Sequence, residues 1–93
     1  MSKLNELQRQ MIAAMPDVKA DELLVQEAIK KMAAKLKKTR AKGRGGGWHG
    51  VTCKNSDLWL LLQNQMLNGR DPVDIMNIAA MIAVRKDLYG EKA

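Results

Sequence analysis

Apolar residues recur every three or four positions through most of this chain, which is the spacing that places them on one face of an α-helix. The first such stretch covers residues 2–15 and ends at Pro16, because the residue before a proline is disfavoured in the helical conformation. The second runs from residue 18 or 21 to residue 40, with acidic side chains at its start and cations at its end, the order that suits the helix dipole. Gly43 is a candidate for the residue that ends this helix, because glycine is favoured just after a helix C-terminus. Residues 1–42 are therefore predicted to form a helical hairpin.

The second half of the chain predicts two more helices. A third helix extends to residue 68, with Asn55 or Ser56 as its cap. The fourth begins at Pro72, because proline is favoured at the first helical position and Asp71 has the residue type of an N-cap. It continues to about residue 88, so residues 55–93 form a second hairpin.

The fold class expected from these patterns is all-α, with about four helices arranged as two helical hairpins. A Gly-rich loop at residues 43–54 joins the hairpin of residues 1–42 to that of residues 55–93, and the 93 residues form one domain. Leu, Ile, Met and Ala supply most of the apolar mass, which favours helices, and Phe is absent.

The fourth helix is apolar nearly all round, since only Asp74 and Asn77 are polar between Val73 and Val84. Such a helix is normally buried, and a single chain of four short helices has too small a core to cover it. A homo-oligomer is therefore predicted. Asn77 is expected to set the register of the interface, although a satisfied core or surface asparagine is the ordinary alternative. The expected interface residues are Leu61, Val73, Met76, Asn77, Ala80, Met81 and Val84.

The net charge is +6, and the positive excess lies in one segment. Residues 30–44 contain eight basic and no acidic side chains, whereas the rest of the chain carries eight basic and ten acidic ones. A run of like charges is usually a solvated helix face. This run leads directly into the Gly-rich loop, however, which gives an anion-binding interpretation comparable weight.

Five of the seven glycines fall between Lys42 and Gly50, beside Trp48 and the only histidine. Glycine lets backbone N–H groups turn toward an anion, Arg44 adds a planar pair of donors for phosphate, and Trp48 offers a flat face for a base. A flexible, solvated linker is the alternative. The residues predicted to bind a ligand are Lys38, Arg40, Lys42, Arg44, Gly45, Gly46, Gly47, Trp48 and His49.

The second half of the chain contains a Gly-Gly-Trp segment, then a Leu-rich helix, then a turn of the Gly-Asp-Pro-Val-Asp type that leads into a helix with Asn and Met. The residues are Gly45-Gly46-Gly47-Trp48, Cys53, Leu58, Leu62, Gly69, Asp71-Pro72-Val73-Asp74, Asn77 and Met81. Over about residues 43–85 this combination resembles a group of small tailed-bacteriophage accessory proteins whose function is unassigned. The chain differs from that pattern by an extra glycine before Trp48 and by Arg70 between Gly69 and Asp71. The resemblance implies an accessory phage protein and transfers no catalytic residue.

No catalytic motif accompanies the loop. A Walker-type Gly-Lys-Ser/Thr does not follow the glycines, and paired carboxylates are not evident. His49 and Cys53 supply two metal ligands per chain, with Asp57 as a possible third, so a metal site would have to be bridged across an oligomer. Nucleophilic catalysis by Cys53 with His49 would require activation in a formed pocket, and a structural thiol is the alternative. One cysteine excludes an intramolecular disulfide and fits a reducing compartment, and neither a signal peptide nor a membrane span is expected. We expect a non-enzymatic cytoplasmic protein without metal or cofactor, which the resemblance would place in an infected host cell.

Three binding hypotheses remain. In the first, the oligomer sequesters a small phosphorylated nucleotide signal of host defence, cyclic or not, with phosphate on the loop N–H groups and Arg44, the base stacked on Trp48, and a hydrogen bond from His49. In the second, the Lys30–Arg44 stripe tracks a nucleic-acid backbone. In the third, a Met-rich surface inhibits a host protein. The clustered glycines favour the first hypothesis, because a small ligand needs a few converging charges instead of a long line of them.

Overall fold

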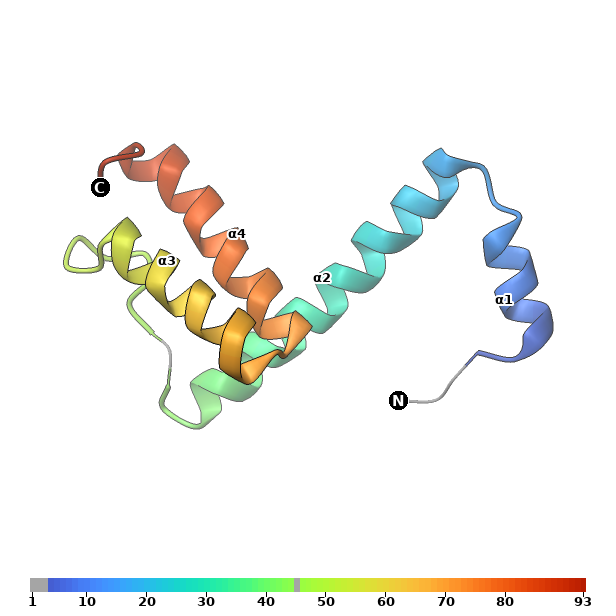
Figure 1. Ribbon diagram of the computed structural model, residues 1–93, viewed down its shortest axis with the longest axis horizontal. Helices are drawn as coiled ribbons and strands as arrows, with labels where there is room; N and C mark the ends of the chain where they lie inside the picture. The colour runs from blue at the N-terminus through green and yellow to red at the C-terminus, as the bar shows by residue number, and fades with distance from the viewer. Residues whose placement is uncertain (1–3, 45) are drawn as a thin grey trace. The chain divides into compact units, whose positions relative to one another are not determined.

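The computed structural model describes residues 4–44 and 46–93, and within these ranges the chain forms helices and turns without a β-strand (Figure 1). The helical segments are α1 (Glu6–Ala13), α2 (Asp17–Ala41), α3 (Asn55–Asn64), the π-helical turn η1 (Gln65–Gly69) and α4 (Pro72–Tyr89). The predicted all-α class with four helices is confirmed.

The chain divides into two compact units, Met1–Lys30 and Lys31–Ala93, so the division falls within α2. The Gly-rich segment at residues 43–54, which the sequence suggested as a joint between hairpins, belongs to the second unit.

The first unit contains α1 and the beginning of α2. Asn5 caps α1, because its side chain accepts a hydrogen bond from the Gln8 backbone N–H at 2.8 Å while the Gln8 side chain accepts one from the Asn5 N–H at 3.1 Å. The α-helix is shorter than the predicted stretch of residues 2–15. No described residue of this unit is buried, and Leu7, Met11 and Val25 are all exposed. The apolar stripe predicted here therefore exists, but its own unit does not cover it.

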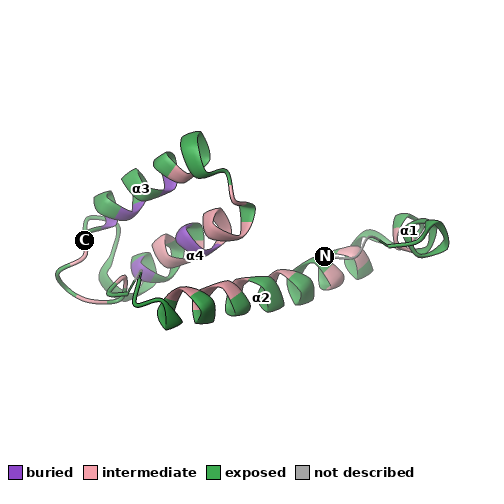
Figure 2. Ribbon diagram, turned by 90° about the horizontal axis from the view of Figure 1, so that it is seen from below, coloured by how far each residue is buried: buried purple, intermediate pink, exposed green. Residues whose placement is uncertain are grey.

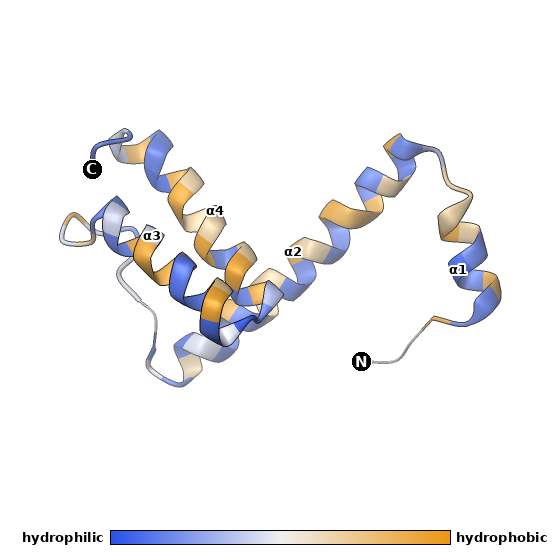
Figure 3. Ribbon diagram, in the orientation of Figure 1, coloured by the Kyte–Doolittle hydropathy of each residue, from blue (hydrophilic) through white to orange (hydrophobic). Residues whose placement is uncertain are grey.

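The core of the second unit lies between α3 and α4. Its buried apolar side chains are Leu58 and Leu62 of α3 and Ile78 of α4, and Figure 2 shows the buried positions on the facing sides of these two helices. Hydrophobic residues recur along α3 and α4 (Figure 3), and several of them, including Leu60 and Leu88, are exposed. The core is therefore small compared with the apolar material that these helices carry.

The end of α2 follows local capping chemistry. Gly43 adopts φ 72°, which lies in the left-handed region that glycine enters without steric cost. The Gly43 N–H donates to the Arg40 carbonyl at 2.9 Å, and the Arg44 N–H donates to the Thr39 carbonyl at 3.1 Å. This pair of bonds is a Schellman motif, and it confirms Gly43 as the residue that terminates the helix.

The beginning of α4 is capped as predicted, whereas that of α3 is not. Asp71 accepts hydrogen bonds from the N–H groups of Val73 at 2.9 Å and Asp74 at 3.3 Å, and Pro72 holds the first helical position. The N-cap of α3 is Lys54, so the expectation that Asn55 or Ser56 caps this helix is wrong. The helix predicted to extend to about residue 68 is α-helical to Asn64 and continues as the π-helical turn to Gly69.

Candidate functional site

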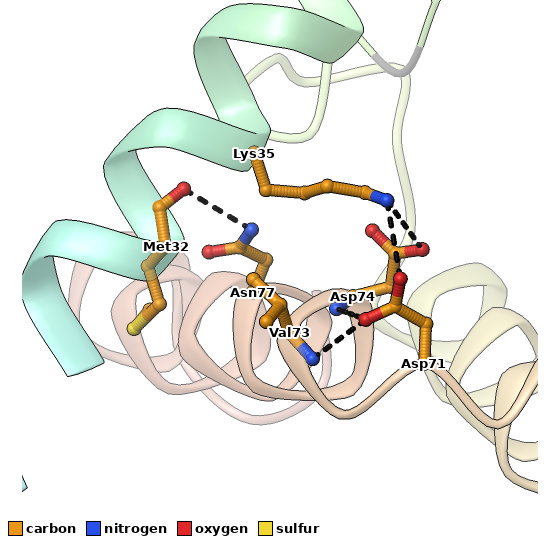
Figure 4. Close-up of polar contacts among 6 residues, drawn as sticks. All are labelled: Met32, Lys35, Asp71, Val73, Asp74 and Asn77. Atoms are coloured by element: carbon orange, nitrogen blue, oxygen red, sulfur yellow. Dashed lines mark hydrogen bonds and ion pairs between the residues drawn. The ribbon is translucent and has the colours of Figure 1, made fainter. Parts of the chain in front are cut away.

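A cluster of polar contacts holds the second half of α2 against the beginning of α4 (Figure 4). The Lys35 ammonium lies 3.1 Å from an Asp71 carboxylate oxygen and 3.7 Å from one of Asp74. The buried Asn77 amide donates a hydrogen bond to the Met32 carbonyl at 3.3 Å. These contacts position α2 along one side of the space described next.

The Lys35 contacts shift two pKa values. The hydrogen bond to Asp71 and the charge of Asp74 raise the pKa of Lys35 above its ordinary value. The same hydrogen bond, together with the N–H groups of Val73 and Asp74, lowers the pKa of Asp71. Lys35 is thus committed to an ion pair within the protein, which reduces its availability to a ligand.

A cavity of about 710 Å³ lies among the second half of α2, the Gly-rich segment, α3 and α4. This volume falls within the range of small-molecule sites. Its basic side, formed by the end of α2 and the loop that follows, carries five cations, and the rest of the lining includes apolar side chains together with the carboxylates of Asp57 and Asp74. The lining cations are Lys35, Lys38, Arg40, Lys42 and Arg44. The lining apolar side chains are Leu36, Leu58, Leu61, Ile78 and Met81.

Most residues predicted to bind a ligand line this cavity. They are Lys38, Arg40, Lys42, Arg44, Gly46, Gly47 and Trp48. His49 does not line it, although its ring makes an edge-on contact with the ring of Trp48, with 5.6 Å between centroids. Gly45 lies outside the described residues.

The cations of the basic side are not equivalent. Arg40 donates a hydrogen bond of 2.7 Å to the Arg44 carbonyl, which ties the end of α2 to the loop. The side chains of Lys38, Lys42 and Arg44 have no hydrogen bond or ion pair with any other residue that the structure describes. We therefore regard these three side chains, all exposed, as the cations available to an anion.

The residues predicted at an oligomer interface fall into two groups. Leu61, Asn77 and Met81 line the cavity. The others lie away from it, and these are Val73, Met76, Ala80 and Val84. Asn77 is buried within its own chain and bonded to Met32, so its role in setting the register of an interface remains a prediction.

The wall formed by the Gly-rich segment is built around a residue that the sequence analysis did not single out. Arg85 of α4 is only 1% exposed. Its Nη1 donates to the carbonyls of Trp48 at 2.8 Å and Gly50 at 2.9 Å, and its Nη2 donates to that of Cys53 at 2.7 Å. At these three residues the carbonyl groups, which are hydrogen-bond acceptors, point toward an internal cation. The expectation that N–H groups of the loop hold an anion stays a prediction.

Two further side chains complete the arrangement around Arg85. Asn55 accepts a 2.7 Å hydrogen bond from the Arg85 Nε and donates to the carbonyls of Gly90 and Glu91. Tyr89 donates from its hydroxyl to the His49 carbonyl at 2.6 Å, and its ring centroid lies 4.7 Å from the Arg85 guanidinium carbon. Asn55 is thus occupied by tertiary contacts, which explains why it does not cap α3.

The comparisons with known proteins add no identity. No protein-family model, curated protein or solved structure matches this chain. The interpretation of the cavity therefore rests on its own chemistry. Among residues 4–44 and 46–93, no three His, Cys, Asp or Glu side chains gather closely enough to hold a metal ion, and no helix is long and apolar enough to cross a membrane.

The chemistry of the cavity suits a ligand that is anionic at one end and flat or apolar at the other. Lys38, Lys42 and Arg44 offer charge-assisted hydrogen bonds to an anion. Trp48, which is half-buried, offers a face or an edge to an aromatic group. The apolar side chains of the lining can contact that group. The sequence could have indicated Arg85, since it lies seven residues after the buried Ile78 and thus on the same side of α4.

Proposed function

We propose that this chain is a non-enzymatic binding protein whose cavity takes a small phosphorylated nucleotide. The observation that carries this proposal is the meeting, around one space of about 710 Å³, of three cations without a protein partner among the described residues, one tryptophan and five apolar side chains. A nucleotide combines the same features, because it joins a flat base to a phosphate.

The phosphate would lie on the basic side of the cavity. Arg44 can present two parallel N–H donors to phosphate oxygens, and Lys38 and Lys42 supply additional positive charge. The backbone there is compatible with a close approach, because a side chain at Gly46 or Gly47 would meet nothing within 4 Å and the glycines leave that space open.

The base would lie toward Trp48 and the apolar side chains of α3 and α4. Stacking on an aromatic ring is tolerant of base identity, so this arrangement selects nucleotides as a class. Sequestration of a nucleotide signal that serves host defence is the biological role we propose, and it depends on the resemblance to small phage proteins.

The proposed assembly is a homo-oligomer. Trp59, Leu60 and Leu67 are exposed on α3 and η1, and Val84 and Leu88 are exposed on α4. Together with the uncovered stripe of the first unit, this supports burial between copies.

Calorimetric titration with AMP, ATP, a cyclic dinucleotide and a 20-nucleotide single-stranded DNA tests the proposed ligand class. We expect Arg44→Ala to weaken nucleotide binding by about 10- to 100-fold, since hydrogen bonds to charged groups contribute about 1.5–3 kcal/mol. Trp48→Ala should weaken it by about 5- to 100-fold through the loss of about 1–3 kcal/mol of stacking, with helicity unchanged. Lys37→Ala is the matched control, because Lys37 is an exposed cation of the same helix that does not line the cavity.

The salt dependence separates the two anionic ligand classes. The slope of log affinity against log salt concentration is about −0.7 for each phosphate of a single strand that the protein neutralises. A pocket that holds one or two phosphates therefore gives a shallow slope, and a site that follows a strand gives a steep one. Binding of the oligonucleotide alone, with equal losses in Arg44→Ala and Lys37→Ala, would contradict the proposal in favour of a nucleic-acid site.

A further inference from the structure

We infer that Arg85 is a positioning residue for the cavity, because its guanidinium holds the Trp48–Cys53 segment in the turn that forms one wall. The consequence for ligand binding rests on the proposed function, whereas the consequence for the loop does not. Arg85 itself does not line the cavity. It would act through Trp48, Thr52 and Cys53, which do.

The segment has little else to hold its shape. Within residues 46–53 the one described backbone hydrogen bond joins the Gly50 N–H to the Gly47 carbonyl at 3.1 Å. Arg85 adds bonds to three carbonyls of the same segment, and Tyr89 adds one to that of His49. Most described hydrogen bonds that fold this wall therefore come from side chains at the end of α4.

The geometry requires a guanidinium. Arg85 serves four acceptors through three nitrogen atoms, and these acceptors lie on Trp48, Gly50, Cys53 and Asn55. A planar fork of five N–H donors can do this, whereas a lysine ammonium has three donors on one atom and cannot reach the same spread of acceptors. Lysine at this position would keep the charge but lose the turn.

The charge of Arg85 also bears on the site. None of its hydrogen-bond partners is a carboxylate, and its contact with Tyr89 is with the ring face. A buried cation compensated only by neutral dipoles keeps its long-range field. The field of Arg85, which lies behind the wall that contains Trp48, adds to the field of Lys38, Lys42 and Arg44. The combined positive potential favours an anion in the cavity.

The test compares Arg85→Lys with Arg70→Lys, the same substitution at an exposed arginine of the same unit. Both are made in a Trp59→Phe background, so that Trp48 is the sole tryptophan reporter. With Arg85 in place, we expect backbone amide order parameters from NMR relaxation of about 0.85 at Trp48 and Gly50. In Arg85→Lys they should fall below about 0.6. The emission of Trp48 should shift to longer wavelength in the same variant, and Arg70→Lys should change neither signal.

The affinity for ATP gives a second measurement. Because a misplaced Trp48 loses its stacking, Arg85→Lys should weaken ATP binding at least about fivefold while circular dichroism stays unchanged. A rigid loop with unshifted Trp48 emission in Arg85→Lys would overturn the inference, even if ATP binding fell. If the parent protein failed to bind ATP while the loop loosened as expected, the inference would stand and ATP would be excluded as the ligand.

A measurement on the unmutated protein covers the case in which Arg85→Lys does not fold. A guanidinium that is buried and bonded to four acceptors should exchange its Nε proton with water far more slowly than exposed Arg70 does. Side-chain nitrogen–proton spectra recorded across neutral pH report both protons. Equal exchange at Arg85 and Arg70 would overturn the inference.

Discussion

Leu62→Ala tests whether the core of the second unit lies where α3 and α4 meet. Leu62 is 8% exposed and, with Leu58 and Ile78, makes up the buried apolar residues described. A unit of about 60 residues has a free energy of unfolding of about 3–9 kcal/mol, at 0.05–0.15 kcal/mol per residue. Truncation of a buried leucine costs about 2–5 kcal/mol. We expect the lower part of that range, about 2–3 kcal/mol, because so small a core can partly collapse around the missing atoms.

The expected loss is a large part of the total, and it is easily measured. At about 4–8 °C per kcal/mol for a domain of this size, Tm should fall by about 8–24 °C. Urea unfolding followed by circular dichroism gives the same quantity as a lower midpoint with an unchanged m-value.

Leu60→Ala is the matched control, because it makes the same change in the same helix at a side chain that is 64% exposed. It should alter the free energy of unfolding by no more than about 0.5 kcal/mol. Equal losses at Leu60 and Leu62, independent of protein concentration, would refute the packing of α3 described above. Equal losses that grow on dilution would show instead that Leu60 is buried between copies.

Two further predictions concern assembly and pH. Val84 is 43% exposed on α4, so Val84→Asp should dissociate an oligomer without unfolding the chain, whereas Ile78→Asp should unfold the chain because Ile78 is buried within it. Sedimentation combined with circular dichroism distinguishes the two outcomes, and a monomeric, stably folded wild type would contradict the oligomer. The Lys35–Asp71 pair should stabilise the fold fully above the ordinary Asp71 pKa of 3.8 and below the ordinary Lys35 pKa of 10.5, with the acid loss occurring as pH falls through the lowered pKa of Asp71. When the urea midpoint of unfolding is plotted against pH, its fall at acid pH should be smaller in Asp71→Asn, which retains a capping side chain, and unchanged in Asp87→Asn. The same fall in Asp71→Asn as in the wild type would argue against the ion pair.

Local chemistry predicted the features that depend on neighbouring residues. The end of α2 at Gly43 and the start of α4 at Asp71 and Pro72 involve donors and acceptors within five positions of each other, so residue types alone indicated them. The cap of α3 was wrong for the opposite reason. The Asn55 side chain is occupied by partners 30 to 36 residues away, and no local rule includes them.

The candidate site shows the same division. Charge and glycine content indicated which residues line the basic side of the cavity, because those residues adjoin one another in sequence. The same reasoning did not find Arg85, whose acceptors precede it by 30 to 37 residues. Nor did that reasoning show that Lys35 forms ion pairs with Asp71 and Asp74, because these residues become its neighbours only after α2 and α4 have packed.

The π-helical turn Gln65–Gly69 joins α3 to the junction that precedes α4. A wider turn accommodates more residues than an α-helical one, and Arg70 follows it with φ 55°, a conformation usually taken by glycine. Without Arg70, Gly69 would directly precede Asp71, and a glycine would then take the left-handed conformation with less strain than an arginine. We therefore expect the deletion of Arg70 to be accommodated within the turn, so that the faces α3 and α4 present to each other keep their register.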